Sequence, residues 1–358
     1  HAGTPAWRRT LRFLFCAVAE RESPERAITA WRSLLPFFEP AALDANPAPA
    51  GVLADCLEVA HAKGWRIDDF QGPLRSACDR ALDHLPPETR AHLWLTLGRL
   101  GLDDRPGVGL RDGLPDIAWE ACDAGEFLYG DAREKRRLKT PFHIARYPVT
   151  HRQFQAFVDA GGYGQDKWWA GLAARPEAIP AQWSEPNAPR ETVSWYEATA
   201  FCRWLDAQLR DAGLLPTGWE VSLPTEEQWE RAARGTNGRE YPWEGDFRSG
   251  LANINETWDG AGPCNLHRTS PVGLYPDGKA PSGALDMAGN VWEWCRSEYD
   301  EPERLADRGD GSRVVRGGSW INFAASCRAA CRDGYAPDDQ DSLRGFRVCC
   351  APPIGSHP

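Results

Sequence analysis

Turn-forming residues and tryptophan together set the strongest limit on how this chain of 358 residues can fold. Its 34 glycines and 29 prolines make up about 18% of the chain, against about 12% in average proteins. Thirteen of the 17 tryptophans lie from Trp119 onward, mixed with turn residues at short intervals. A helical bundle does not tolerate so many chain-breaking residues. We therefore expect a loop-rich α+β domain in the C-terminal two thirds, with buried tryptophans in its core.

The first 100 residues follow a different pattern. Apolar residues recur there at helical spacing, and prolines between residues 36 and 87 divide the segment into short helices. Residues 102–115 are rich in Gly, Asp and Pro, which is typical of a linker. We expect a small all-α region over residues 1–115 and a separate α+β domain over residues 116–358.

Three helix starts in the second domain carry N-terminal capping signals. Thr150 precedes an apolar-periodic segment, Ser194 and Glu197 form a capping box, and Thr225 precedes two glutamates. Short strands are expected at residues 142–145, 313–316 and 345–349.

Charge and hydropathy exclude two classes of partner. The net charge of -10 disfavours binding to a phosphate backbone, which needs clustered Lys and Arg, so we expect no nucleic acid. The mean hydropathy is -0.53, and no apolar stretch approaches the roughly 20 residues of a membrane helix, so we expect no membrane insertion.

The 11 cysteines show neither even, dense spacing nor a CxxC pair, which favours reduced thiols. Residues 11–19 have a faint likeness to a signal peptide, but Arg12 interrupts the segment. We therefore expect a cytoplasmic protein.

Six motifs occur in a fixed order along the second domain. They are Tyr-Pro-Val-Thr at 147–150, Val-Ser-Trp-Tyr-Glu-Ala at 193–198, Leu-Pro-Thr-Glu-Glu-Gln-Trp-Glu at 223–230, Asp-Met-Ala-Gly-Asn-Val-Trp-Glu-Trp at 286–294, Arg-Gly-Gly-Ser-Trp at 316–320 and Gly-Phe-Arg at 345–347. The set resembles the formylglycine-generating-enzyme (sulfatase-modifying factor) branch of the C-type lectin fold. The resemblance implies an α+β fold of that type over roughly residues 135–350, held by buried Trp and by Arg bonded to loop carbonyls.

The resemblance also implies a calcium site in the motif at 286–294. A hard cation takes oxygen ligands, which Asp286 and Glu293 would supply from side chains, and Gly289 and Val291 from backbone carbonyls. The alternative is that the two carboxylates only hydrogen-bond the turn and that no ion binds.

The formylglycine-generating enzymes oxidise a substrate cysteine with copper held by two cysteine thiolates, which are soft ligands suited to Cu(I). The matching positions here hold Asn322 and Cys327. Because an amide cannot replace a thiolate, we expect no copper and no activity of this kind. Cys327 alone is expected to pack as a small buried hydrophobe.

A second enzymatic branch of the fold, the sulfoxide synthases of ergothioneine biosynthesis, adds an N-terminal helical bundle with His ligands for iron. The present N-terminal region is also expected to be helical, but His61, His84 and His92 lack the spacing that puts two imidazoles on one helix face. The sequence therefore disfavours iron chemistry, and we interpret each histidine as a surface or capping residue.

The segment after the Gly-Gly-Ser-Trp motif resembles the variable region of diversity-generating retroelement target proteins. Its framework comprises Cys-Arg-Ala-Ala at 327–330, Arg332, Pro-Asp at 337–338 and Gly-Phe-Arg at 345–347. In those relatives a reverse transcriptase replaces template adenines, often in AAC codons, so that NNC codons result. Such codons cannot encode Lys, Glu, Gln, Met or Trp, and none of these five occurs at residues 321–336. A GC-rich genome poor in Lys would also produce this absence.

The resemblance predicts a variable region over residues 316–347 that contains two kinds of position. Ligand-binding, variable positions are Ile321, Asn322, Phe323, Ser326, Cys331, Asp333, Gly334, Tyr335, Ala336, Asp339, Asp341, Ser342 and Leu343. Scaffold positions are Gly317, Gly318, Ser319, Trp320, Arg328, Arg332, Gly345, Phe346 and Arg347, with the three arginines bonded to loop carbonyls.

The mixture of aromatic, aliphatic and acidic residues in one aperiodic loop suits an exposed recognition surface, as in antibody loops. We therefore expect a ligand-binding or display protein that recognises an unknown protein or surface ligand. The resemblance to retroelement target proteins also implies association with a phage or prophage as the alternative to a purely cytoplasmic setting. The alternative is a non-diversified relative of the formylglycine-generating enzymes, either catalytically degenerate or with an unassigned oxidase activity.

Overall fold

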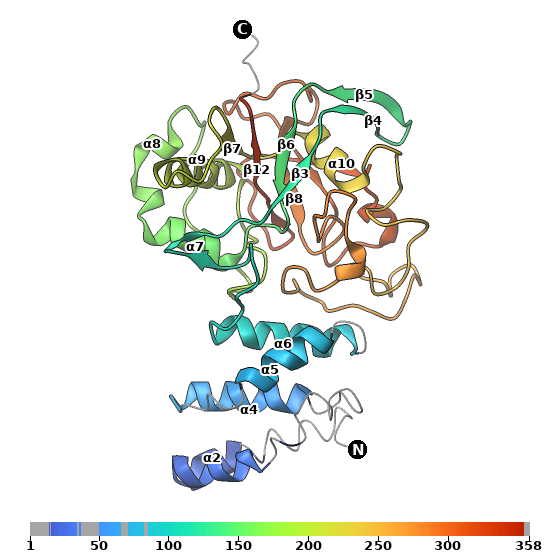
Figure 1. The fold of residues 1–358 in the computed structure, drawn as a ribbon. Helices are drawn as coiled ribbons and strands as arrows, with labels where there is room; N and C mark the ends of the chain where they lie inside the picture. Colours follow the sequence, from blue (N-terminus) through green and yellow to red (C-terminus); the bar gives the residue numbers. More distant parts are fainter. Residues whose placement is uncertain are drawn as a thin grey trace. The chain divides into compact units, whose positions relative to one another are not determined.

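The chain forms two compact units, His1–Asp104 and Arg105–Pro358 (Figure 1). The computed structural model describes residues 14, 16–33, 36, 50–65, 71–81 and 85–353. No helix within these ranges combines the length and the apolarity needed to cross a bilayer.

The regular secondary structure described in the first unit is helical, which confirms the expected all-α region. Ser23 caps the helix Pro24–Arg32 by accepting a hydrogen bond from the backbone N–H of Arg26. Leu53 and Leu93 are fully buried and belong to two helices that pack against each other. The helices are α2 (Pro24–Arg32), α4 (Ala50–Ala62), α5 (Gln71–Ala81) and α6 (Pro87–Arg99).

The boundary between the units lies eleven residues before the one expected from sequence, after Asp104 instead of after residue 115. Residues 105–115 are not a free linker, because they form a hairpin that is bonded into the second unit. Thr150 Oγ1 donates to the carbonyl of Val108 at 2.8 Å, and Gln153 Nε2 donates to that of Gly107 at 3.1 Å.

The second unit contains two four-stranded sheets and two hairpins. The sheets have strand orders β3-β6-β12-β7 and β10-β9-β8-β11, and all pairs are antiparallel except β8 with β11. The hairpins are β1-β2 and β4-β5. The strands are β1 (Leu110–Arg111), β2 (Leu114–Pro115), β3 (Trp119–Cys122), β4 (Gly125–Tyr129), β5 (Glu134–Leu138), β6 (Phe142–Ala145), β7 (Glu220–Ser222), β8 (Trp292–Glu298), β9 (Arg313–Arg316), β10 (Arg332–Tyr335), β11 (Arg344–Gly345) and β12 (Cys349–Ala351).

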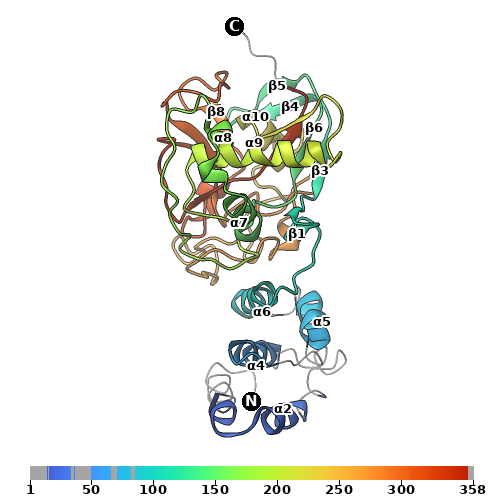
Figure 2. The ribbon, with the colours of Figure 1, turned by 90° about the vertical axis from the view of Figure 1, so that its left-hand side faces the viewer.

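Helices cover the first of these sheets on both sides (Figures 1 and 2). Ala145 and Val348 pack into a core with α9, whereas Ile144 and Cys349 pack into a second core with α10. The helices are α7 (His151–Asp159), α8 (Asp166–Trp169), α9 (Trp195–Asp211) and α10 (Glu226–Arg234), with short 3-10 helices at Gly162–Gly164, Pro276–Gly278 and Ala324–Cys327.

The three expected helix starts are confirmed, each as a full capping box. In each, the cap hydroxyl accepts a backbone N–H, and the side chain three residues later accepts the N–H of the cap residue. The pairs are Thr150 with Gln153, Ser194 with Glu197 and Thr225 with Gln228.

The strands expected at 142–145 and 313–316 are confirmed as β6 and β9, but the single strand expected at 345–349 is wrong. The chain instead passes from β11 in one sheet to β12 in the other. Arg347 lies in this crossing and is fully buried, with its guanidinium bonded to Glu293 and to the carbonyl oxygens of Ala145 and Leu285.

Tryptophan fills the cores of the second unit, as expected. Eight of its thirteen tryptophans are buried, and Trp195, Trp229 and Trp294 are fully inaccessible. Trp258 is the exception, with 67% of its surface exposed.

Candidate functional site

The segment 316–347 runs from the end of β9 through the 3-10 helix Ala324–Cys327 and β10 to β11. None of the thirteen residues expected to contact a ligand is buried: Ile321 and Ala336 are exposed, and the other eleven are partly accessible. Five of the ten other positions between residues 321 and 343 are buried: Ala324, Cys327, Ala329, Ala330 and Pro337. Ala325 and Asp338 are exposed, and Arg328, Arg332 and Gln340 are partly accessible. The residues directly before Trp320 and after Leu343 are buried.

The expected scaffold positions are less accessible than the candidate variable positions and support this segment from the protein interior. Gly317, Gly318, Ser319, Gly345, Phe346 and Arg347 are buried, and Trp320, Arg328 and Arg332 are half-buried.

Each of the three expected arginines donates to a loop carbonyl. Arg328 Nε reaches Ala325 O at 3.1 Å, and Arg332 reaches Tyr299 O at 2.8 Å. Arg332 also pairs with buried Glu226 at 2.6 Å. Such charge-assisted bonds hold an irregular backbone that has few ladder hydrogen bonds of its own.

Gly318 packs directly on Cys327. It has a φ of 75°, and a Cβ at this position would lie 2.4 Å from Cys327 Sγ. The close approach explains the Gly in the Gly-Gly-Ser-Trp motif, because any side chain there would collide with the buried thiol.

Two of the candidate variable positions are restricted by their surroundings. Asn322 Oδ1 accepts hydrogen bonds from Ser319 N–H at 2.9 Å and from Ser319 Oγ at 2.7 Å, so this side chain stabilises the turn. A Cβ on Gly334 would lie 2.4 Å from the ring of Tyr299. Any replacement at either position requires its neighbour to move.

The acidic end of the segment is organised by Arg344. Its guanidinium, which is almost completely buried, contacts the carboxylates of Asp339 and Asp341 at 2.7 Å each. It also lies 4.1 Å from the centre of the Tyr335 ring, at cation–π distance. These three candidate residues therefore share one positively charged partner.

Two aromatic residues outside the segment extend the accessible surface, and the sequence analysis did not identify them. The exposed ring of Trp258 lies 6.3 Å from that of Phe323, and Trp183 makes an edge contact of 5.2 Å with Trp320. The Asn255 N–H donates to the carbonyl of Asn322 at 2.9 Å, which attaches the Trp258 loop to the segment. No sequence pattern marks a tryptophan as exposed, so only the fold could show it.

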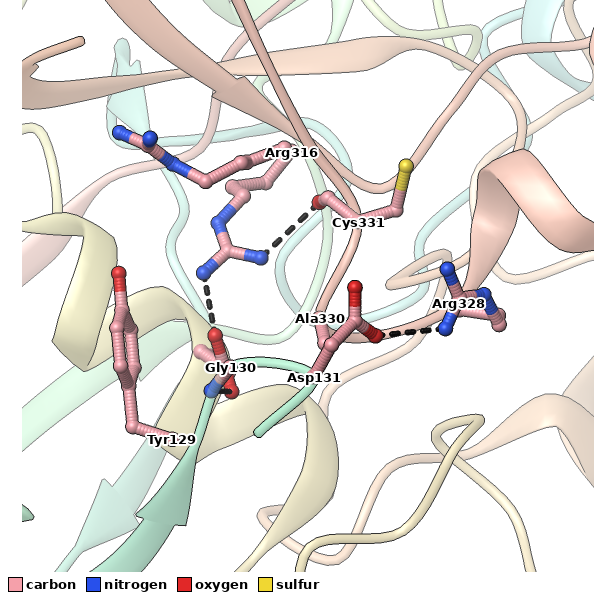
Figure 3. Close-up of a pocket in the computed structure, with 9 residues that line it drawn as sticks. Tyr129, Gly130, Asp131, Arg316, Arg328, Ala330 and Cys331 are labelled. Atoms are coloured by element: carbon pink, nitrogen blue, oxygen red, sulfur yellow. Dashed lines mark hydrogen bonds and ion pairs between the residues drawn. The ribbon is translucent and has the colours of Figure 1, made fainter. Parts of the chain in front are cut away.

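A polar pocket of about 220 Å³ lies between the segment and the tip of the β4-β5 hairpin (Figure 3). In Figure 3, Arg328 pairs with Asp131 at 2.6 Å, and Arg316 reaches the carbonyl of Cys331 at 3.0 Å. Three guanidiniums and two carboxylates line the pocket, and the third guanidinium, that of Arg332, pairs with Glu226 outside the lining. Its lining is Tyr129, Gly130, Asp131, Glu230, Arg316, Arg328, Ala330, Cys331 and Arg332.

The residues at the family's copper position do not fit a two-thiolate copper site. Asn322 supplies an amide that is already bonded to Ser319, and Cys327 is fully inaccessible. Burial raises the pKa of the Cys327 thiol far above its usual range, which disfavours the thiolate that binds copper.

The expected calcium ligands do not fit calcium in this arrangement. Both oxygens of Glu293 accept hydrogen bonds at 2.6 Å from the Arg347 guanidinium, and Oε2 also accepts from Trp229 Nε1 at 2.7 Å. Asp286 Oδ2 accepts from the N–H of Gly273. Arg347 already neutralises the charge of Glu293. The arrangement therefore fits the alternative to the calcium site with Gly289 and Val291, in which the two carboxylates only hydrogen-bond the turn.

The three histidines of the first unit lie in different surroundings. His61 is exposed on α4, and His84 lies outside the described residues. His92 is not a surface residue: its side chain is 17% exposed and faces Asp55.

Comparison with known proteins agrees with the fold. The family model of the sulfatase-modifying factor enzyme 1-like domain matches residues 121–352. The hercynine oxygenase of Mycolicibacterium thermoresistibile is 34% identical over 245 residues, which are 58% of this chain and 50% of that protein. The chain thus spans about half the length of this relative.

Two further similarities cover more of the matched protein. The inactive C-alpha-formylglycine-generating enzyme 2 of Bos taurus is 30% identical over 74% of this chain and 93% of its own length. Among solved structures, Treponema denticola variable protein 1 superimposes with a TM-score of 0.48 at 21% identity, over 66% of this chain and 95% of that one.

The extent of the family match, together with the two-sheet α+β architecture, assigns the fold. The chain belongs to the sulfatase-modifying factor enzyme 1-like (FGE-sulfatase) family, with a C-type lectin fold of the formylglycine-generating-enzyme type preceded by a helical region.

Proposed function

We propose that this protein is a ligand-binding or display protein. Its segment 316–347 is the recognition surface, and a retroelement diversifies the side chains of that surface. One observation supports the proposal most: the thirteen candidate positions are all at least partly accessible, whereas half of the ten positions interleaved with them are buried. Substitution at accessible positions usually changes stability by less than about 0.5 kcal/mol. Such a division allows side chains to vary while the backbone stays in place.

The chemistry of the surface is that of a protein-recognition site. Phe323, Tyr335 and the exposed Trp258 supply rigid aromatic anchors, which are common at binding hot spots. Carboxylates and Ser side chains between them supply adaptable polar contacts. We infer an unknown protein or surface ligand as the partner, and a cytoplasmic or phage-associated setting for the interaction.

Asn322 and Gly334 belong to the proposed surface, but the residue types that fit at these two positions are restricted. Because Asn322 holds Ser319 and Gly334 abuts Tyr299, we expect fewer residue types at these two positions than at Ile321.

The nucleotide sequence around the gene tests diversification directly. We expect a nearby near-copy of the segment encoding residues 316–347, with AAC codons at the candidate positions and a reverse-transcriptase gene beside it. A gene without any such near-copy would refute the diversification.

The alternative is a catalytically degenerate family member or one with an unassigned oxidase activity. It has support because the similar proteins include a hercynine oxygenase and two proteins named as inactive formylglycine-generating enzymes. The test is incubation of the reduced protein with copper, oxygen and a sulfatase-type cysteine peptide, with Cys327→Ser as control. We expect no conversion of the peptide; conversion that requires Cys327 would replace the binding proposal by the oxidase.

A further inference from the structure

In the helical unit, three side chains with metal-binding atoms converge between α4 and α6. Asp55 and Glu58 stand one turn apart on α4, and His92 lies on α6. One ligand atom from each lies within 4.8 Å of the other two. This unit is separate from the recognition surface and takes no part in the proposed function.

The contact between His92 and Asp55 does not have hydrogen-bond geometry. His92 Nε2 lies 3.2 Å from Asp55 Oδ1, yet this buried nitrogen has no hydrogen-bond partner among the described residues. The lone pair of an imidazole nitrogen that does not donate is able to bind a cation, and Asp55 Oδ1 lies close enough to bind the same ion.

The separation also fits two ligands of one ion. Atoms bound at 2.0–2.1 Å with tetrahedral angles lie about 3.3 Å apart, and the observed distance is 3.2 Å. Asp55 is only 1% exposed and follows buried Leu53 and Ala54 along the helix. The carboxylate is therefore shielded from water, which strengthens its attraction to a cation.

Glu58 is oriented as a third ligand by its neighbours. Its Oε1 accepts hydrogen bonds from Thr96 Oγ1 at 2.9 Å and from Arg99 at 2.5 Å. Carboxylates that bind metals are usually held by such bonds from surrounding groups. A small movement of the side chain brings its carboxylate within bonding distance of an ion held by the other two residues.

We propose that Asp55, Glu58 and His92 form a binding site for a divalent transition-metal ion of the zinc type. One imidazole and two carboxylates suit such a borderline ion, and three protein ligands leave one position for water. Bound there, the ion joins α4 to α6 and stabilises the helical unit.

Titration of the full-length, reduced, metal-stripped protein with Co2+ tests the site. We expect one Co2+ per chain, a visible absorption spectrum without a thiolate-to-metal band, and displacement by one equivalent of Zn2+. The missing thiolate band separates this site from adventitious binding to the 11 free cysteines.

Variants assign the ligands. Asp55→Asn and His92→Gln should each weaken Zn2+ binding by more than about 100-fold, and Thr96→Val by about 10- to 100-fold. The matched control is His61→Gln, which changes an exposed histidine on α4, the helix of Asp55. This variant should bind Zn2+ like the wild type. If Asp55→Asn does not fold, as judged by circular dichroism, Glu58→Gln takes its place. Absence of binding to the wild type, or binding that survives His92→Gln, would overturn the proposal.

Discussion

At Gly318 the recognition segment has no space for a side chain. The backbone there is left-handed, and Cys327 Sγ occupies the direction in which a Cβ would point. Gly113 shares the positive φ, at 81°, but has open space around it. Comparing substitutions at Gly318 and Gly113 therefore distinguishes the cost of the backbone conformation from the cost of the steric collision.

We predict that Gly318→Ala lowers the free energy of unfolding more than Gly113→Ala does. Both replacements carry about 1–2 kcal/mol of left-handed strain, and Gly318→Ala adds about 1–3 kcal/mol from overpacking against Cys327. Urea denaturation of both variants measures the difference. Equal losses would show that the thiol moves aside without cost.

Asp286 is a second residue whose surroundings set a measurable property. Burial raises the pKa of its carboxyl from 3.8 to about 6, and the N–H of Gly273 and the charge of Arg347 only partly oppose the rise. The folded protein therefore binds this proton more tightly than the unfolded chain. The stabilisation is complete below about pH 4 and is lost as the pH rises through 6.

Replacing Asp286 by Asn should remove this dependence, because the amide keeps an acceptor oxygen for Gly273 and never ionises. A shift of about two pKa units corresponds to at most about 3 kcal/mol. We expect Asp286→Asn to match the wild type near pH 4 and to be more stable at pH 7.5, measured by urea denaturation in EGTA. Asp277→Asn, at an exposed residue, serves as the control. A wild type that is more stable than the variant at pH 7.5 would contradict the expectation.

At the scale of elements, the recognition segment combines regular pairing with exposed turns. Strand β10 pairs with β9 in register, Arg332 opposite Arg316 and Tyr335 opposite Arg313. Buried Arg316 bonds to Glu230 of α10 and to the carbonyls of Ala329 and Cys331. The segment is thus held by a helix and a sheet, and the candidate side chain of Asn322 adds the hydrogen bonds at Ser319.

The same substitution at two alanines tests this division of roles. Ala336 is exposed, whereas Ala329 is completely buried. We predict that Ala336→Val changes the free energy of unfolding by less than about 0.5 kcal/mol and that Ala329→Val lowers it by about 1–3 kcal/mol. Thermal or urea unfolding measures both; a larger loss at Ala336 would mean that the exposed positions also carry stability.

At the scale of the whole molecule, residues 105–115 belong to the lectin-like unit. Val108 is 2% exposed and packs with Tyr147, Val272 and Leu285 in a small core of that unit. The bond from Gln153 to the carbonyl of Gly107 fastens the same stretch.

Two truncated chains test where the unit begins. We expect residues 105–358 to unfold cooperatively when expressed without the helical unit. A chain of residues 116–358 should be less stable by at least about 2 kcal/mol, because the burial of Val108 and the bonds of the hairpin are lost. Calorimetry measures the melting temperatures of the two truncated chains. Equal melting temperatures would show that the lectin-like unit begins after residue 115.

The sequence by itself determined the features that neighbouring residues encode. Capping at Thr150, Ser194 and Thr225 depends on residues three positions away, and the ordered motifs around residues 147–347 identified the family. These features can be read locally because their hydrogen bonds and turns form within a few residues.

Only the tertiary structure decided what depends on residues far apart in the chain. It paired Arg347 with Glu293, which removes the calcium ligand expected from the motif, and it brought His92 to Asp55 on another helix. It also left Trp258 exposed while burying most other tryptophans. Burial and charge pairing are set by packing between distant segments, so the same residue type can fill a core, neutralise a charge or face a partner.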